Sequence, residues 1–178
     1  MNECKVESQT ALKNRLVVGG SVCVMLLLLA ATIAKWLLWG IFIPLEWLAE
    51  LLVIGFLFER SYSRYCCTLT DAGFRFEKKS FRRTKLDVPL SDVFALYPYR
   101  PALVGLVKFR RSYRMHSALD NREVWTLAYR YETSGGNENR RIYFKPSSEM
   151  LTALKQCLPE KIMAGQEGAA VAEQKTIQ

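Results

Sequence analysis

The chain has 178 residues, a length that suits one ordinary domain plus a small additional segment. Half of the residues are hydrophobic, and the formal net charge is +8. Only Lys35, Glu46 and Glu50 are charged between Leu16 and Phe58, and as a helix the apolar run 16–34 reaches roughly 28 Å, about one bilayer core. This pattern excludes an ordinary soluble domain and indicates an integral membrane protein.

A cleaved secretory signal is the competing interpretation of the apolar N-terminal run. Lys13 and Arg15 precede it, as cations precede the apolar core of a signal peptide. The run is longer than such a core, however, and a second apolar segment follows almost at once. The five cysteines form no C-x-x-C pair, which argues against a zinc site and suits a reducing compartment.

The segment 36–52 predicts a chain reversal at a membrane surface. Tryptophan favours the membrane–water interface, and Gly40 and Pro44 favour a turn. We therefore expect a transmembrane hairpin of two helices, near 14–38 and 44–62. The predicted interface residues are Lys35, Trp36, Trp39, Glu46, Trp47 and Glu50.

The distribution of cations predicts the orientation of this hairpin. Lys5, Lys13 and Arg15 precede the first helix, and Arg60 and Arg64 follow the second. Positive flanks stay on the cytoplasmic side. The expected location is therefore the inner cell membrane, as a multi-pass protein with both termini in the cytoplasm.

Glu46 and Glu50 allow two interpretations. As intramembrane carboxylates they would form a proton relay in a subunit of a transporter or membrane enzyme. As residues near the interface they would anchor the turn or contact Lys35. The second interpretation is favoured, because the first helix offers only Lys35 as a charged partner.

After residue 63 the pattern changes to the alternation of half-buried β-strands. A serine N-cap, Glu149 and Pro159 then delimit a C-terminal amphipathic helix with one apolar stripe. The expected segments are a cytoplasmic N-terminal segment 1–13, the hairpin 14–62, a β-rich domain 63–159 and a disordered tail 160–178. The expected strands, which together suggest a seven-stranded antiparallel β-barrel, are 64–70, 73–79, 84–90, 92–97, 102–111, 123–132 and 141–145.

Three segments carry a resemblance to a known family. They are "YCCTLTDAGFRFE" (65–77), "VPLSDVFALY" (88–97) and "FKPSSEMLTALKQCL" (144–158). In this order, after two apolar segments, they resemble the bacterial PH-like (pleckstrin-homology-like) membrane proteins of the YcxB-like group. The resemblance implies an α+β membrane protein with a transmembrane hairpin and a cytoplasmic PH-like barrel, closed by the C-terminal helix.

The β-rich part carries most of the positive charge. Between Arg60 and Lys161 there are 20 lysines and arginines against 10 acidic residues. The densest group surrounds Phe81 in an expected loop, a pattern that suits contact with anionic lipid headgroups. Topology and solubility alone also account for such charge. The candidate lipid- or anion-binding residues are Lys78, Lys79, Arg82, Arg83 and Lys85; a second group is Lys108, Arg110, Arg111 and Arg114.

The sequence carries no pattern typical of an enzyme, a metal site or a nucleic-acid-binding protein. His116 is the only histidine, and no P-loop or G-x-S-x-G motif occurs. We expect no catalytic residue, no metal, no cofactor and no nucleic-acid partner. The predicted function is a membrane-anchored, non-enzymatic interaction or scaffold module, whose partners are the lipid bilayer and a protein partner or a second copy of the chain.

Overall fold

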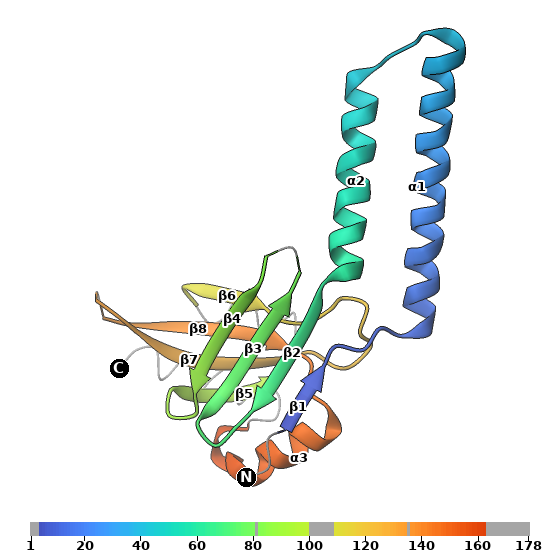
Figure 1. The fold of residues 1–178 in the computed structure, drawn as a ribbon. Helices are drawn as coiled ribbons and strands as arrows, with labels where there is room; N and C mark the ends of the chain where they lie inside the picture. The colour runs from blue at the N-terminus through green and yellow to red at the C-terminus, as the bar shows by residue number, and fades with distance from the viewer. Residues whose placement is uncertain (1–3, 81, 100–108, 135, 163–178) are drawn as a thin grey trace.

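The computed structural model describes residues 4–80, 82–99, 109–134 and 136–162. Two long helices project from one end of a β-rich domain, and a short helix lies at the opposite end (Figure 1). In chain order the helices are α1 (Leu12–Trp39), α2 (Pro44–Tyr62), α3 (Ser148–Cys157) and the 3₁₀ helix η2 (Pro159–Lys161).

The helices α1 and α2 run side by side in opposite directions (Figure 1). Gly40 ends α1 in the left-handed conformation, with φ 67°, and its N–H donates to the Trp36 carbonyl at 2.9 Å; glycine adopts this conformation at little cost. Pro44 begins α2, where its fixed φ suits the first helical turn and its missing N–H leaves no bond unmade. The reversal of the chain therefore follows from these two residues.

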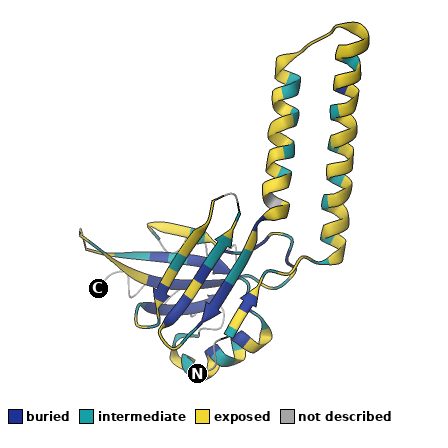
Figure 2. Ribbon diagram, viewed as in Figure 1, coloured by how far each residue is buried: buried dark blue, intermediate teal, exposed yellow. Residues whose placement is uncertain are grey.

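The predicted transmembrane hairpin is wrong, because α1 alone among the described helices is long and apolar enough to cross a membrane by length and composition. Glu46, Glu50 and Glu59 all lie within the 19 residues of α2, and each carboxylate is costly in hydrocarbon. The assignment of two membrane spans is corrected to one candidate span in the described part of the chain. Burial does not separate the two helices, since α1 and α2 are both exposed along almost their whole length (Figure 2).

The first sheet has the strand order β1-β2-β3-β4, and all its pairs are antiparallel. Its edge strand β1 was not predicted. In β1, Cys4 and Val6 alternate with Lys5 and Glu7, and Val6 is buried. The strands are β1 (Cys4–Glu7), β2 (Arg64–Leu69), β3 (Gly73–Lys79) and β4 (Thr84–Pro89).

The second sheet has the order β5-β7-β8-β6. The pairs β5–β7 and β7–β8 are antiparallel, whereas β6 runs parallel to β8, with Ser112 beside Arg141 and Arg114 beside Tyr143. The strands are β5 (Val93–Pro98), β6 (Arg111–Arg114), β7 (Trp125–Thr133) and β8 (Gly136–Phe144).

These two sheets of four strands replace the predicted single seven-stranded barrel, which is wrong. The described strands form two separate hydrogen-bonded sheets, and the parallel β6 breaks the expected antiparallel order. Most of the expected strand 102–111 and most of the expected disordered tail lie outside the described residues. Residues 160–162 are ordered against the second sheet, where Ile162 bridges to Leu96.

The core fills the space between the sheets, with α3 closing the end away from α1 and α2 (Figures 1 and 2). Phe74, Phe76 and Phe144 form its aromatic centre, with ring centroids 5.5–6.1 Å apart. Met150 and Leu154 of α3 are fully buried against it. The Ser147 hydroxyl caps α3 by accepting from the Met150 N–H at 3.1 Å. The predicted apolar stripe of the C-terminal helix is confirmed in these two residues.

Candidate functional site at the junction of the helices and the sheets

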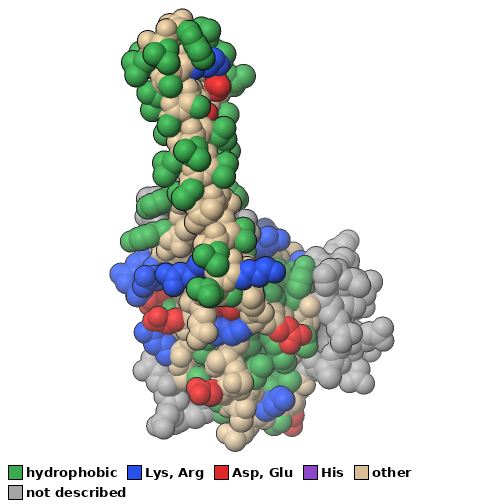
Figure 3. Space-filling view, turned by 90° about the vertical axis from the view of Figure 1, so that its right-hand side faces the viewer, with side chains coloured by type: hydrophobic (Ala, Val, Ile, Leu, Met, Phe, Trp, Pro, Cys, Tyr) green, Lys and Arg blue, Asp and Glu red, His purple; other side chains and the backbone are tan. Residues whose placement is uncertain are grey.

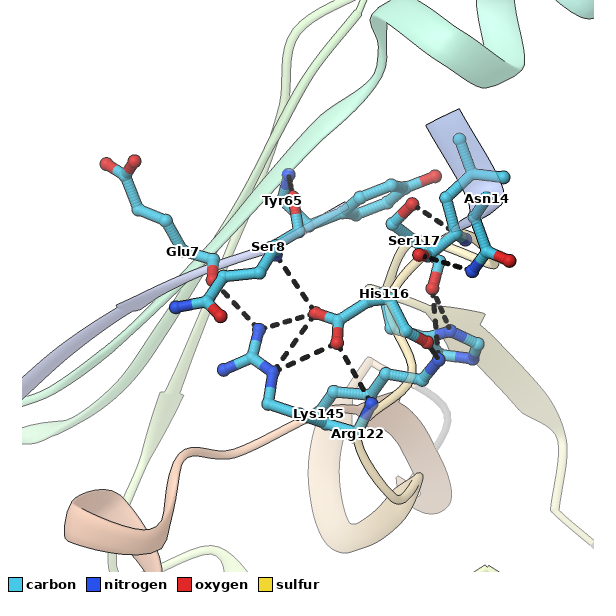
Figure 4. A network of polar contacts seen from close by, with 11 residues as sticks. Glu7, Ser8, Asn14, Tyr65, His116, Ser117, Arg122 and Lys145 are labelled. Carbon is cyan, nitrogen blue, oxygen red and sulfur yellow. Dashed lines mark hydrogen bonds and ion pairs between the residues drawn. The ribbon is translucent and has the colours of Figure 1, made fainter. Parts of the chain in front are cut away.

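Polar side chains concentrate where α1 leaves the β-rich domain (Figure 4). The carboxylate of Asp120, in the loop between β6 and β7, is almost fully buried. It accepts hydrogen bonds from the side chain and N–H of Arg122 and from the N–H of Gln9 at 3.1 Å. Arg122 also donates to the Glu7 carbonyl at 2.8 Å. One buried ion pair therefore joins the 115–122 loop to the segment between β1 and α1.

Two further contacts extend this connection to α1 itself. Asn14, in the first turn of α1, donates to the Leu119 carbonyl at 2.8 Å and to the Asn121 side chain at 2.9 Å. The Ala11 N–H donates to the same Leu119 carbonyl at 3.3 Å. The first turn of α1 is thus held to the β-rich domain by hydrogen bonds from Ala11 and Asn14.

Lys145, which follows β8, makes two further hydrogen bonds to the 115–122 loop. Its ammonium donates to the Ser117 carbonyl at 3.1 Å and to the Asp120 carbonyl. Burial lowers the pKa of Lys145, and the Asp120 carboxylate opposes this. Because two of its three donors bind backbone carbonyls of the 115–122 loop, Lys145 stabilises this loop.

The titration of Asp120 reflects its partners. Burial by itself would raise the pKa of Asp120, but the hydrogen bonds from Arg122 and Gln9 outweigh burial, so the pKa lies below the ordinary 3.8. His116, beside it, has its pKa lowered below 6.5, chiefly by burial. His116 Nδ1 lies 3.4 Å from the Ser117 carbonyl.

The predicted basic group surrounds the turn between β3 and β4, which points toward the same side of the domain as α2 (Figure 1). Lys78 forms an ion pair with Glu59 near the end of α2 at 3.4 Å and lies over the Tyr65 ring. Lys85 pairs with Glu77 at 3.3 Å. Lys79, Arg82 and Arg83 are exposed. The structure therefore brings this turn to the junction, although two of its five cations are engaged in ion pairs.

Other cations flank the same junction. Arg15 at the start of α1 and Arg64 at the start of β2 line a hollow between the two helices. Figure 3 shows Lys and Arg side chains gathered around the base of the helices, below a largely hydrophobic shaft. We call this set the junction cations: Arg15, Arg64, Lys78, Lys79, Arg82 and Arg83.

The predicted interface residues lie at the opposite tip of the helices. Lys35 donates to Glu46 at 2.9 Å, and the Thr32 hydroxyl donates to Glu50 at 2.7 Å. Trp36 and Trp47 pack edge to face, with ring centroids 6.2 Å apart, and both contact Phe42. Trp39 is exposed. The structure thus brings five of the six predicted residues into contacts that join α1 to α2, and leaves Trp39 outside them.

A second hollow on the β-rich domain was not predicted. It lies over β6 and β8 and is lined by Tyr99, Ser112, Arg114, His116, Val124, Arg141 and Tyr143. Arg114 belongs to the second basic group noted in the sequence. Arg141 was not among the candidate residues, because no pattern in the sequence distinguishes it. Among the described residues, no three His, Cys, Asp or Glu side chains are placed to hold a metal ion.

The comparisons with known proteins add no assignment to this geometry: no family model, curated protein or solved structure matches the chain. The resemblance to the bacterial PH-like membrane proteins therefore stays a prediction.

Proposed function

We propose that the protein is a membrane-anchored, non-enzymatic interaction module. In this proposal α1 lies in the bilayer and the β-rich domain rests on anionic headgroups at the cytoplasmic side of the cell membrane. The observation that carries the proposal is the position of the junction cations, directly at the base of a helix that is apolar and exposed. Such cations are each worth about 1 kcal/mol near an anionic surface.

The cytoplasmic orientation is part of the proposal. Lys13 and Arg15 lie in the first turn of α1, on the side of the β-rich domain. Cations that flank a membrane span stay in the cytoplasm. Anionic lipid on the inner leaflet then faces the exposed cations of the turn between β3 and β4.

The contacts of Glu46 and Glu50 support a packing role rather than a proton relay. Each carboxylate accepts a hydrogen bond from α1, from Lys35 and Thr32 respectively. Similarly, Asp120 and Lys145 are engaged in structural bonds beside His116. These contacts favour the non-enzymatic proposal over the alternative of a transporter or membrane-enzyme subunit.

The experiment uses the full chain in lipid nanodiscs, because β1 and Asn14 make the N-terminal segment part of the domain. Hydrogen–deuterium exchange of the peptide covering Lys79 to Thr84 is compared in phosphatidylcholine alone and with about one third phosphatidylglycerol. Exchange should slow in the anionic nanodiscs and recover in about 0.5 M salt, where the Debye length is roughly half its value at 0.1 M.

The variant Arg82→Gln/Arg83→Gln should abolish the slowing. The matched control Arg130→Gln/Lys155→Gln removes two exposed charges from β7 and α3 and should retain it. Equal exchange in neutral and anionic nanodiscs would overturn the lipid contact. Release of the full chain from membranes by alkaline carbonate would overturn the anchor.

A further inference from the structure

The hollow over β6 and β8 is built by the parallel pairing of these strands. Ser112 is in register with Arg141, and Arg114 with Tyr143. Because residues two apart on a strand face the same side, these four side chains form a square array on one face of the sheet. Tyr99, just beyond β5, adds an aromatic wall: its ring meets that of Tyr143 edge to face, with centroids 5.1 Å apart.

Arg141 has no acidic partner among the described residues and is held in place by other contacts. Its Nε donates to the Ser112 hydroxyl at 2.7 Å. Its guanidinium carbon lies 4.9 Å from the centre of the Phe109 ring and 5.2 Å from that of Tyr143. These contacts orient the planar group through cation–π attraction, and they leave donor N–H groups for another molecule, since a guanidinium carries five.

The charge of the hollow is not balanced by the residues that line it. The lining contains Arg114 and Arg141 but no carboxylate, and within the described ranges neither arginine forms an ion pair. On the same sheet, by contrast, Arg110 and Arg140 both pair with Glu138, at 3.2 and 2.9 Å. Two guanidiniums in one hollow without a carboxylate form a site of positive potential.

The dimensions and chemistry of the hollow suit a small anion. Its volume is about 550 Å³, within the range of about 300–1,000 Å³ typical of ligand pockets. Arginine binds phosphate through two parallel hydrogen bonds. The hydroxyls of Ser112 and Tyr143 interact with each other in the same hollow and together leave one further donor. The Tyr143 pKa is raised, chiefly by burial, so its hydroxyl stays protonated and able to donate.

We propose that this hollow binds a phosphate group, with Arg114 and Arg141 as its charged ligands. Two kinds of ligand carry such a phosphate group: a soluble phosphomonoester and a phospholipid headgroup. A soluble phosphomonoester would enter from solvent, with its ester group beside the packed rings of Tyr99 and Tyr143. A lipid headgroup would enter from the membrane side, because Arg114 and His116 also line a groove that reaches Phe56 of α2.

The test uses the full chain in mild detergent and isothermal titration with three probes: inorganic phosphate, phenyl phosphate and short-chain phosphatidic acid. We expect at least one phosphate probe to bind at sub-millimolar concentration. Arg114→Gln should weaken that binding about tenfold or more, since hydrogen bonds between charged groups are lost. Arg111→Gln is the matched control, because Arg111 precedes Ser112 on the same strand and faces the opposite side.

Arg114 is exposed and outside the packed core, so its variant tests the proposal even if Arg141→Gln fails to fold. Binding of phenyl phosphate alone assigns a soluble ligand, and binding of phosphatidic acid alone assigns a lipid headgroup; both support the phosphate site. The proposal is overturned by absence of binding to all three probes, or by equal affinity in Arg114→Gln and the parent chain, or by an equal loss in Arg111→Gln. Slowed exchange at the turn between β3 and β4 tests the membrane contact separately.

Discussion

Arg122 donates from one guanidinium nitrogen, Nη2, to both the Asp120 carboxylate and the backbone carbonyl of Glu7. This places a single side chain between the loop that follows β6 and the end of β1. Since α1 begins five residues after Glu7, the direction in which the helix leaves the domain depends on this contact. The network therefore couples α1, the candidate membrane span, to the β-rich domain.

Asp120→Ala should destabilise the β-rich domain substantially. The substitution removes the carboxylate that pairs with the Arg122 guanidinium and that accepts from the Gln9 N–H. Removing one partner of a fully buried ion pair costs about 3–5 kcal/mol; because Arg122 retains some solvent contact, we expect about 2–3 kcal/mol. The melting temperature of the full chain in detergent should fall by about 5–10 °C.

Glu123→Gln is the control for this measurement, since Glu123 is an exposed acidic residue on the same loop. Its melting temperature should match that of the parent chain. For a chain of this size, a 2 °C fall in melting temperature corresponds to a loss of about 0.5–1 kcal/mol in the free energy of unfolding. A smaller fall in Asp120→Ala would contradict a structural role for the ion pair.

Gly73→Ala should also destabilise the domain, for a steric reason. A Cβ at Gly73 would lie 2.3 Å from the Val88 carbonyl oxygen, in the adjacent strand β4. The neighbour is backbone within a sheet, so relief requires the strands to shift, and such overpacking costs about 1–3 kcal/mol. The same detergent melt measures the effect. Gly19→Ala, where an added Cβ meets nothing within 4 Å, should leave the melting temperature unchanged or raise it.

Strand positions were largely predictable because the alternation of side chains is a local property. Phe74 and Phe76 face the core and Arg75 faces solvent, as their spacing predicts. Pairing between strands is not local, and the parallel contact between β6 and β8 follows no signal in either segment. The strand β1 carries its own alternation of Cys4 and Val6, but its four residues are too few to distinguish from a polar segment.

The candidate sites show the same limit. The basic turn was visible as a cluster in sequence, but its ion pairs with Glu59 and Glu77 depend on the fold. In the sequence, Asp120 and Arg122 look like ordinary polar loop residues. Their role is visible only in the fold, which places Gln9 and Glu7 next to them. The two-span prediction failed because the apolar residues of α2 were weighed above its three carboxylates.

Placement of α1 in the bilayer predicts protection of Cys23. This thiol is on α1 and exposed in the chain itself, and it lies well inside the apolar run. In membranes it should resist a membrane-impermeant maleimide and react after detergent is added. Cys66, on β2, is partly exposed outside the span and serves as the reactive control. Equal labelling of Cys23 before and after solubilisation would exclude membrane insertion of α1.

Stability should fall as the pH drops below about 6.5 because of His116. Its pKa in the folded chain is lowered, chiefly by burial, with Lys145 and Arg114 acting in the same direction and Asp120 against them. The unfolded chain therefore binds a proton first, near pH 6.5, and the free energy of unfolding decreases by at most about 1.4 kcal/mol per pH unit until the folded form is also protonated.

Melting temperatures of the full chain between pH 7 and 3 measure this effect, with the range from pH 7 to 5 reporting on His116. His116→Gln should flatten the profile in that range. Asp120→Asn serves as the comparison, since the lowered pKa of Asp120 gives stability that is present above about pH 4 and lost as the pH falls through the folded value. That variant should keep the slope between pH 7 and 5 and lose the acid-side drop. A parent profile that is already flat from pH 7 to 5 would show that His116 titrates alike in the folded and unfolded chain.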